Sequence, residues 1–468
     1  MDELWALDAT ELADRLRRRD VSAREVVAAH LARIEQVNPA INAIVTLDGE
    51  GALKAAAAAD DALAGGAEPG PLHGLPIAFK DTHDTAGMRT TYGSPLFAEH
   101  VPAANTLVVQ RIEDAGAIRV GKTNVPEFAA GSHTFNTLFG VTRNPYDPTR
   151  SAGGSSGGAA AALAARLLPI ADGSDMGGSL RNPASFCNVV GFRPTPGRVP
   201  TVPTDDPWDT LGTSGPMART VADVALLLSV VAGPDSRSPI ALDEPGATFR
   251  APLGADLSGL RVAWSPDLGG LPLDPDVRAV LAGAPDVFTG LGAHVEAATP
   301  DLSEADLVFR TLRANAFEIA YGATFDEQPE KFKPALAWNI SQGRALTRGD
   351  VGRARTAWGR LYTAAAAFWD TYNVLIAPVS QVPPFPAGWE YPHTVDEADQ
   401  HSYLDWMRSA YHVTVLGAPA ISVPAGFTPT GLPVGLQIVT RPRSDLFTLR
   451  VAAAFEAATN HGRHHPAL

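Results

Sequence analysis

Two serines and one lysine have the residue types and surroundings that acyl transfer requires. Ser155 lies in the stretch SAGGSSGGAAAALAA, residues 151–165, where glycines surround two adjacent hydroxyls. Ser179 lies in GSDMGGSLRNP, residues 173–183, directly after two glycines. Backbone N–H groups beside glycines are free of side-chain cover, so they can point at a developing oxyanion. We therefore predict that Ser179 is a nucleophile whose own loop supplies the oxyanion hole.

The matching general base is predicted at Lys80. This lysine ends the apolar segment GLPIAFK, residues 74–80, which is typical of a buried strand. Burial disfavours the charged form of a lysine and lowers its pKa, so a neutral amine could accept a proton at physiological pH. A hydroxyl both accepts and donates hydrogen bonds, so Ser155 could relay the proton between Ser179 and Lys80.

The glycine-rich loop allows other interpretations, and two of them fail on the sequence. GGSSG at residues 153–157 fits the G-x-S-x-G nucleophile elbow, and His412 or His461 could serve as the partner of its serine. The serine of such an elbow, however, directly follows a β-strand. Residues 144–150 carry two prolines and no apolar run. A phosphate-binding loop requires Lys-Ser/Thr after its last glycine, and Gly158 is followed by alanines. An unusual backbone geometry that needs glycine neighbours, or a flexible surface loop, remains.

The elements that must position these residues alternate between helix and strand. Helices are predicted at residues 3–36 (two), 52–65, 106–115, 159–167, 221–231 and over most of 303–369. Strands are predicted at residues 75–80, 117–121, 168–171, 374–378, 420–423 and 434–439, the last two as a hairpin. This order predicts a single α/β domain with a mixed, twisted central sheet between layers of helices.

Composition excludes several classes of function. The chain has 468 residues and a formal net charge of −14, which disfavours nucleic acid or an anionic membrane as a partner. The N-terminal segment lacks the pattern of a secretion signal, and no apolar run reaches the roughly 18–20 residues that span a bilayer. We therefore expect a cytoplasmic protein.

Neither the single cysteine nor the histidine-rich end of the chain predicts a second kind of chemistry. Cys187 lies in an apolar stretch and is interpreted as a buried core thiol rather than a nucleophile. His461, His464 and His465 lie near glycine and proline, and we interpret them as a solvated tail. We expect no metal and no cofactor.

Seven segments, taken together and in order, resemble the amidase signature family. They are GLPIAFKD, GKTNVPEFA, SAGGSSGGAA, GSDMGGSLRNPASF, GFRPTPGRVP, GPMARTVADVALLLSVVAGPD and GAPAISVPAGF followed by GLPVGLQIV. The matches run from about residue 20 to residue 458 and are densest over 74–231. The resemblance implies one amidase domain, 1–468, with N-terminal helices (1–70), a signature core (71–232), a variable helical region lining the substrate entrance (233–380) and a C-terminal sheet and helix (381–468).

The resemblance implies a Ser–cis-Ser–Lys triad. Ser179 matches the acylating nucleophile, Ser155 the bridging serine held by a cis peptide bond, and Lys80 the base. The backbone N–H groups matching the oxyanion hole belong to Met176, Gly177, Gly178 and Ser179, and the matching supporting positions are Asp175 and Arg181. Ser156 either hydrogen-bonds near Lys80 or caps the following helix, and the sequence favours the cap.

The substrate is less well defined. The family places the scissile amide against the segment that here reads Phe128, Ala129, Ala130, Gly131 and Ser132. Trp208 could line an apolar mouth, as could Phe317, Tyr321 and Trp338, but these residues are equally compatible with ordinary core packing. The motifs are closer to those of bacterial aryl-acylamide amidases than to those of the glutamine-using subunit of the tRNA amidotransferase.

The sequence therefore predicts a serine hydrolase of small aryl or alkyl amides, with esters and carbamates as further substrates. Two alternatives remain open: a glutaminase subunit of a tRNA-dependent amidotransferase, and a catalytically silent binding or assembly module. A homodimer is compatible with the sequence, and residues 303–370 could form a lid.

Overall fold

Two β-sheets adjoin along one edge of each, and each carries one side of the candidate site. The computed structural model describes residues 3–468. The larger sheet has eight strands in the order β10-β9-β11-β15-β14-β7-β8-β6, and the smaller has the order β1-β3-β2. The strands are Ile44–Leu47 (β1), Pro76–Lys80 (β2), Ile118–Thr123 (β3), Phe135–Asn136 (β4), Gly140–Val141 (β5), Ile170–Asp175 (β6), Val190–Arg193 (β7), Thr213–Ala218 (β8), Arg261–Trp264 (β9), His294–Ala297 (β10), Val374–Pro378 (β11), Thr394–Val395 (β12), Ala398–Asp399 (β13), Ala420–Phe427 (β14) and Pro433–Thr440 (β15).

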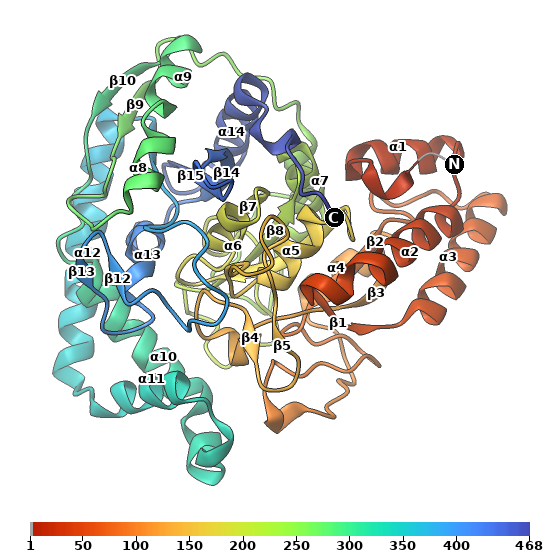
Figure 1. The fold of residues 1–468 in the computed structure, drawn as a ribbon, viewed down its shortest axis with the longest axis horizontal. Coiled ribbons are helices and arrows are strands. Elements are labelled where there is room, and N and C mark those ends of the chain that lie inside the picture. Colours follow the sequence, from red (N-terminus) through yellow and green to blue (C-terminus); the bar gives the residue numbers. More distant parts are fainter. Residues whose placement is uncertain (1–2) are drawn as a thin grey trace.

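Helices surround both sheets, and Figure 1 places the small sheet with α1–α4 at one end of the molecule and α8–α12 at the other. The helices are Ala9–Arg18 (α1), Ala23–Ile41 (α2), Gly49–Ala64 (α3), Leu107–Asp114 (α4), Gly157–Ala164 (α5), Arg181–Phe186 (α6), Val221–Val231 (α7), Pro275–Leu281 (α8), Ala284–Gly290 (α9), Ala305–Glu327 (α10), Pro334–Ala345 (α11), Arg348–Thr371 (α12), Arg408–Thr414 (α13) and Asp445–Thr459 (α14). The predicted α/β architecture with a mixed central sheet is confirmed. Strands β9 and β10, in the segment expected to be helical, extend that sheet.

Local sequence signals account for several element boundaries. Ser22 and Glu25 form a capping box at the start of α2, with Glu25 N–H donating to Ser22 Oγ over 3.2 Å and Ser22 N–H donating to Glu25 Oε2 over 2.8 Å. The predicted hairpin is formed by β14 and β15, which pair antiparallel. Helix α7 spans the predicted residues 221–231 and is buried along most of its length.

The separate three-stranded sheet was not anticipated, and a side chain makes the hydrogen bond that joins its edge strand to the large sheet. Strand β2 lies at one edge of the small sheet, and β6 lies at one edge of the large sheet. The N–H of Lys80, at the end of β2, donates to Asp172 Oδ1 of β6 over 3.0 Å. A carboxylate therefore accepts the hydrogen bond that a main-chain carbonyl would accept in a continuous ladder.

Helix α5 is the small, fully buried element between the sheets. It is built only from glycine, alanine and one leucine, and it contacts β2 and β3 of one sheet and β6 and β8 of the other. A Cβ at Gly158 would lie 2.3 Å from the backbone nitrogen of Asn124, so only glycine permits this approach. The glycine-rich stretch is thus a packed structure rather than a flexible loop.

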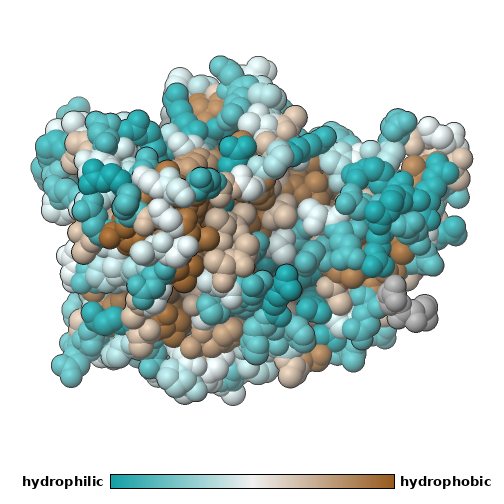
Figure 2. Space-filling model, turned by 90° about the horizontal axis from the view of Figure 1, so that it is seen from above, coloured by the Kyte–Doolittle hydropathy of each residue, from teal (hydrophilic) through white to brown (hydrophobic). Residues whose placement is uncertain are grey.

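The surface carries few large apolar side chains. On the face seen in Figure 2, hydrophobic residues gather in hollows between hydrophilic lobes. Within residues 3–468, no helix is both long enough and apolar enough to cross a membrane.

A buried carboxylate at the start of α14 gives a test of this architecture. Asp445 accepts hydrogen bonds from Thr195 N–H (2.7 Å), Thr195 Oγ1 (2.8 Å) and Arg198 Nη2 (3.1 Å). Because Asp445→Ala removes the buried acceptor of a buried guanidinium, we expect the free energy of unfolding to fall by about 3–5 kcal/mol.

Chemical denaturation would measure this loss. The matched control is Asp370→Ala, which removes the partner of Arg441 in an exposed pair of 2.7 Å and should change stability by less than about 1 kcal/mol. Equal effects of the two substitutions would contradict the assignment of Asp445 as a structural anchor.

Candidate active site

The Lys80 amine lies among three hydroxyl groups at the junction of the two sheets. Its Nζ is within hydrogen-bond distance of Ser155 Oγ (2.8 Å), Ser156 Oγ (3.0 Å) and Ser174 Oγ (2.9 Å). Ser155 and Ser156 precede α5, and Ser174 belongs to β6. A neutral amine has two N–H groups and one lone pair, so it can donate to two of these hydroxyls and accept from the third.

Burial changes the acidity of this lysine. The Lys80 side chain is fully buried, and desolvation lowers its pKa from the ordinary value to about 7, although Asp172 and Asp175 act in the opposite direction. A substantial fraction of Lys80 is therefore neutral near neutral pH, as a general base requires. This agrees with the expectation drawn from its place at the end of an apolar strand.

Ser155 and Ser179 line one cavity of about 170 Å³ beside Lys80. The peptide bond between Gly154 and Ser155 is cis, as the family resemblance implied. Within the described chain, no hydrogen bond joins the Ser155 and Ser179 hydroxyls. Catalytic hydrogen bonds often form fully only when substrate is bound. Both serines nevertheless line the same cavity, so one bound substrate could reach both.

The loop before Ser179 presents free backbone donors to this cavity. Among residues 3–468, the N–H groups of Met176, Gly177 and Ser179 have no protein acceptor. Gly178 differs from the expectation, because its N–H donates to Asp175 Oδ1 over 2.9 Å. The oxyanion donors available in this structure are thus three of the four expected groups.

Asp175 holds the nucleophile loop in place. Its carboxylate accepts from Arg181 Nε and Nη2 (both 3.0 Å), from Leu180 N–H (3.2 Å) and from the Gly178 N–H. Burial raises the pKa of Asp175, but the charges of Arg181 and Arg193 outweigh it and hold the pKa well below the ordinary value. A permanently ionised carboxylate therefore fixes the turn between β6 and α6, which is the supporting geometry that the resemblance implied for Asp175 and Arg181.

Ser156 contacts the lysine rather than the helix that follows it. It occupies the position before α5, but its side chain makes no capping hydrogen bond. Its hydroxyl instead lies 3.0 Å from Lys80 Nζ. The favoured interpretation of Ser156 as a helix cap was therefore wrong, because the buried amine provides a stronger hydrogen-bond partner than the helix N–H groups.

The expected substrate segment lines the cavity only in part. Phe128, Ala129 and Gly131 belong to the cavity wall. Ala130 is buried outside it, and its carbonyl accepts from Lys333 Nζ over 2.6 Å. Trp208 is 67% exposed and does not line this cavity.

Helix α10 supplies the opposite wall. Phe317 and Tyr321 line the cavity, as does Arg313. The aromatic residues were among those considered for an apolar mouth, whereas Arg313 was not singled out from the sequence.

Ser174 is the other site residue that sequence reasoning missed. It lies two residues after Asp172 on β6, so both side chains point to the same face of the strand. Asp172 binds the backbone of Lys80, and Ser174 binds its amine. Strand periodicity could have identified Ser174 once Lys80 was paired with β6, but that pairing was not visible in the sequence.

The residues of the rejected alternatives lie elsewhere. Cys187 is buried, as predicted, and its thiol donates a weak hydrogen bond to Ala152 C=O over 3.4 Å. Burial raises the pKa of the Cys187 thiol. His412 lies 2.9 Å from Asp306, and it does not line the cavity of Ser155 and Ser179.

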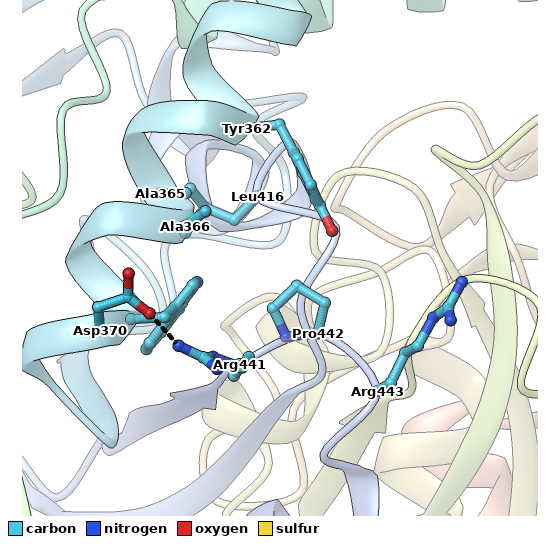
Figure 3. Close-up of a pocket in the computed structure, with 9 residues that line it drawn as sticks. Tyr362, Ala365, Ala366, Asp370, Leu416, Arg441, Pro442 and Arg443 are labelled. Atoms are coloured by element: carbon cyan, nitrogen blue, oxygen red, sulfur yellow. Dashed lines mark hydrogen bonds and ion pairs between the residues drawn. The ribbon is translucent and has the colours of Figure 1, made fainter.

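A larger cavity of about 470 Å³ lies between α12 and the segment after β15 (Figure 3). Its wall contains Tyr362, an ion pair between Asp370 and Arg441 of 2.7 Å, and the apolar side chains of Ala365 and Leu416. It contains no serine, lysine, histidine or cysteine. We therefore place the chemistry in the smaller cavity, despite the larger volume of this one.

Comparisons with known proteins identify the family of this chain. The model of the family described as Amidase matches residues 25–449. The chain is 38% identical over 464 residues to an acylamidase of Rhodococcus erythropolis, covering 98% of this chain and 97% of that one. It is 37% identical over 487 residues to a glutamyl-tRNA(Gln) amidotransferase subunit of Acidothermus cellulolyticus, covering 98% and 95%. The crystal structure of a bacterial aryl acylamidase superposes with a TM-score of 0.92 at 27% identity, covering 98% and 97%. The chain belongs to the amidase signature family and is a hydrolase of amide C–N bonds.

The acidity of Lys80 can be measured directly, because the chain has only five lysines, at positions 54, 80, 122, 331 and 333. With ¹³Cε-labelled lysine, one resonance should titrate near pH 7 and should be missing from the Lys80→Met variant. Lys122 and Lys333, whose pKa values burial lowers to about 8, serve as internal comparisons. A Lys80 midpoint near its ordinary value would contradict the desolvated amine.

Proposed function

We propose that this enzyme cleaves small amides through an acyl-enzyme on Ser179, with Ser155 as the proton relay and Lys80 as the general base. The observation that carries the proposal is the buried Lys80 amine, whose three side-chain hydrogen bonds all join it to hydroxyls and whose pKa is lowered to about 7 by desolvation. One of those hydroxyls, Ser155, lines the same cavity as Ser179.

In the first step, Ser179 Oγ attacks the amide carbonyl carbon. Its proton passes to Ser155 Oγ, and Ser155 gives its own proton to neutral Lys80 Nζ. The carbonyl oxygen becomes an oxyanion, which the free N–H groups of Met176, Gly177 and Ser179 can stabilise. The relay then returns one proton to the leaving nitrogen as the C–N bond breaks.

In the second step, water replaces the amine. The same relay removes a proton from the attacking water, and Ser179 leaves with that proton when the ester bond of the acyl-enzyme breaks. Because an acyl nucleophile with an oxyanion hole also accepts esters and carbamates, we propose these as additional substrates. Aryl and alkyl amides are favoured by the identity to the acylamidase and by the aromatic wall of Phe128, Phe317 and Tyr321.

Substitution of the relay residues tests this mechanism. Ser179→Ala, Ser155→Ala and Lys80→Met should each lower kcat/KM for 4-nitroacetanilide by about 10⁴-fold or more, because the three groups act as one unit. Ser151→Ala is the matched control: it removes a hydroxyl from the same stretch that faces His133 Nδ1 (2.7 Å) and not Lys80. Its loss should be far smaller, and full activity of Ser179→Ala would exclude Ser179 as the nucleophile.

The pH dependence gives an independent test. The base acts in its neutral form, so kcat/KM should fall as the pH decreases below about 7 and should reach a plateau above that value. The kinetic midpoint should equal the midpoint of the Lys80 resonance. A rate that does not change through this range would remove Lys80 as the base.

A panel of substrates separates the proposed function from the amidotransferase alternative, which the many amidotransferase relatives keep open. The purified chain alone should hydrolyse anilides, a p-nitrophenyl ester and an aryl carbamate faster than glutamine. Hydrolysis of glutamine only in the presence of partner proteins would favour the amidotransferase alternative, and no hydrolysis of any compound would favour a silent module.

A further inference from the structure

The wall of the candidate catalytic cavity contains a buried guanidinium that has no acidic partner in the described part of the chain. Arg313 of α10 is only 4% exposed and lines the cavity together with Ser155 and Ser179. Its Nη2 donates to the Tyr403 hydroxyl over 2.8 Å, and its Nη1 lies 3.3 Å from the Met176 sulfur. Its Nε has no hydrogen-bond partner in the described chain.

Three other buried arginines of this protein face carboxylates. Arg181 and Arg193 lie 3.0 Å and 3.4 Å from Asp175 Oδ1, and Arg198 lies 3.1 Å from Asp445 Oδ2. Arg313 instead stacks on the rings of Phe317, 4.2 Å from the centroid, and Tyr403, 5.7 Å from the centroid. Aromatic faces orient a guanidinium, but they leave its in-plane donors free.

The remaining charges of the cavity do not compensate Arg313. Among residues 3–468, Asp175 is the one acidic residue that lines the cavity, and Arg181 and Arg193 already neutralise it. A guanidinium has five N–H donors, and two contacts, one of them to a weakly accepting sulfur, leave most of them unused. A buried charge in this state is stabilised strongly by an anion that brings two oxygens into the plane of the guanidinium.

We propose that Arg313 binds a carboxylate of the substrate, so that the enzyme prefers small amides that carry an acidic group on their acyl or amine part. The inference rests on the proposed function, because it names the substrate class of the same cavity. The cavity volume of about 170 Å³ limits the acid to a small molecule. Helix α10 thereby combines an apolar surface from Phe317 and Tyr321 with one fixed positive charge.

Two matched pairs of substrates test the preference and locate the carboxylate. N-(4-nitrophenyl)succinamic acid and 4-nitrovaleranilide differ in an acyl-side carboxylate, whereas 4-acetamidobenzoate and 4-nitroacetanilide differ in an amine-side carboxylate. For one pair, Arg313→Met should lower the acid-to-neutral ratio of kcat/KM by about 10–100-fold, mainly through KM. Arg313→Lys should restore part of the ratio, because it keeps the charge and loses the planar fork. The ratio cancels any general loss of activity.

Arg310→Met is the matched control. Arg310 lies one turn earlier on α10, pairs with Asp405, and does not line the cavity, so its replacement should leave both ratios unchanged. Unchanged ratios in Arg313→Met, or equal effects of the two substitutions, would overturn the proposal.

A binding measurement keeps the inference separate from the proposed mechanism. Calorimetry on the Ser179→Ala protein should show that N-(4-nitrophenyl)succinamic acid or 4-acetamidobenzoate binds at least tenfold more tightly than its neutral counterpart, and that adding Arg313→Met removes the difference. If the wild type hydrolyses none of the four amides, the proposed function fails, yet this measurement still decides the role of Arg313. If amides are hydrolysed but neither acid binds more tightly, the Arg313 proposal alone fails.

Discussion

The burial of one lysine amine at the junction of two sheets is the constraint on which the site depends. Lys80 belongs to the small sheet. Ser174 belongs to β6, the edge strand of the large sheet, and the loop that carries Ser179 follows this strand. Asp172 joins the two edges by accepting from the Lys80 backbone. Had the two strands formed a regular ladder, no side-chain carboxylate would be needed there. The junction thus fixes the amine and removes it from water, which lowers its pKa.

The glycine-rich stretches serve this burial through close packing. Helix α5 approaches backbone from the small sheet closely enough that a Cβ at Gly158 could not fit. This approach brings the Ser155 and Ser156 hydroxyls to the amine and excludes bulkier groups. On the other side, the ionised Asp175 binds the Gly178 N–H and leaves neighbouring N–H groups unpaired. The Asp175 carboxylate thus uses the Gly178 N–H to support the loop, while the N–H groups of Met176, Gly177 and Ser179 stay available to a substrate.

Reaction class and substrate class depend on different parts of the molecule. The proposed reacting groups come from residues 80–179, in the segment where the family motifs are densest. The opposite wall comes from α10, far later in the chain, and it combines aromatic rings with the charge of Arg313, which has no acidic partner among residues 3–468. The family motifs cover the first part and so predict a reaction class, whereas no motif quoted from the sequence covers the second part.

By itself, the sequence determined the α/β class and the boundaries of α7 and β11, since local periodicity and glycine placement depend on neighbouring residues. It also predicted Lys80, Ser155 and Ser179 as candidate reacting groups, and the fold brings these three residues to one site. Only the tertiary structure decided the division into two sheets, the contact of Ser174 and Ser156 with Lys80, the engagement of the Gly178 N–H, the exposure of Trp208 and the place of Arg313 in the cavity wall. These features depend on which distant strands and helices meet. They are governed by desolvation and by competition between hydrogen-bond partners, and both arise only after the chain has packed.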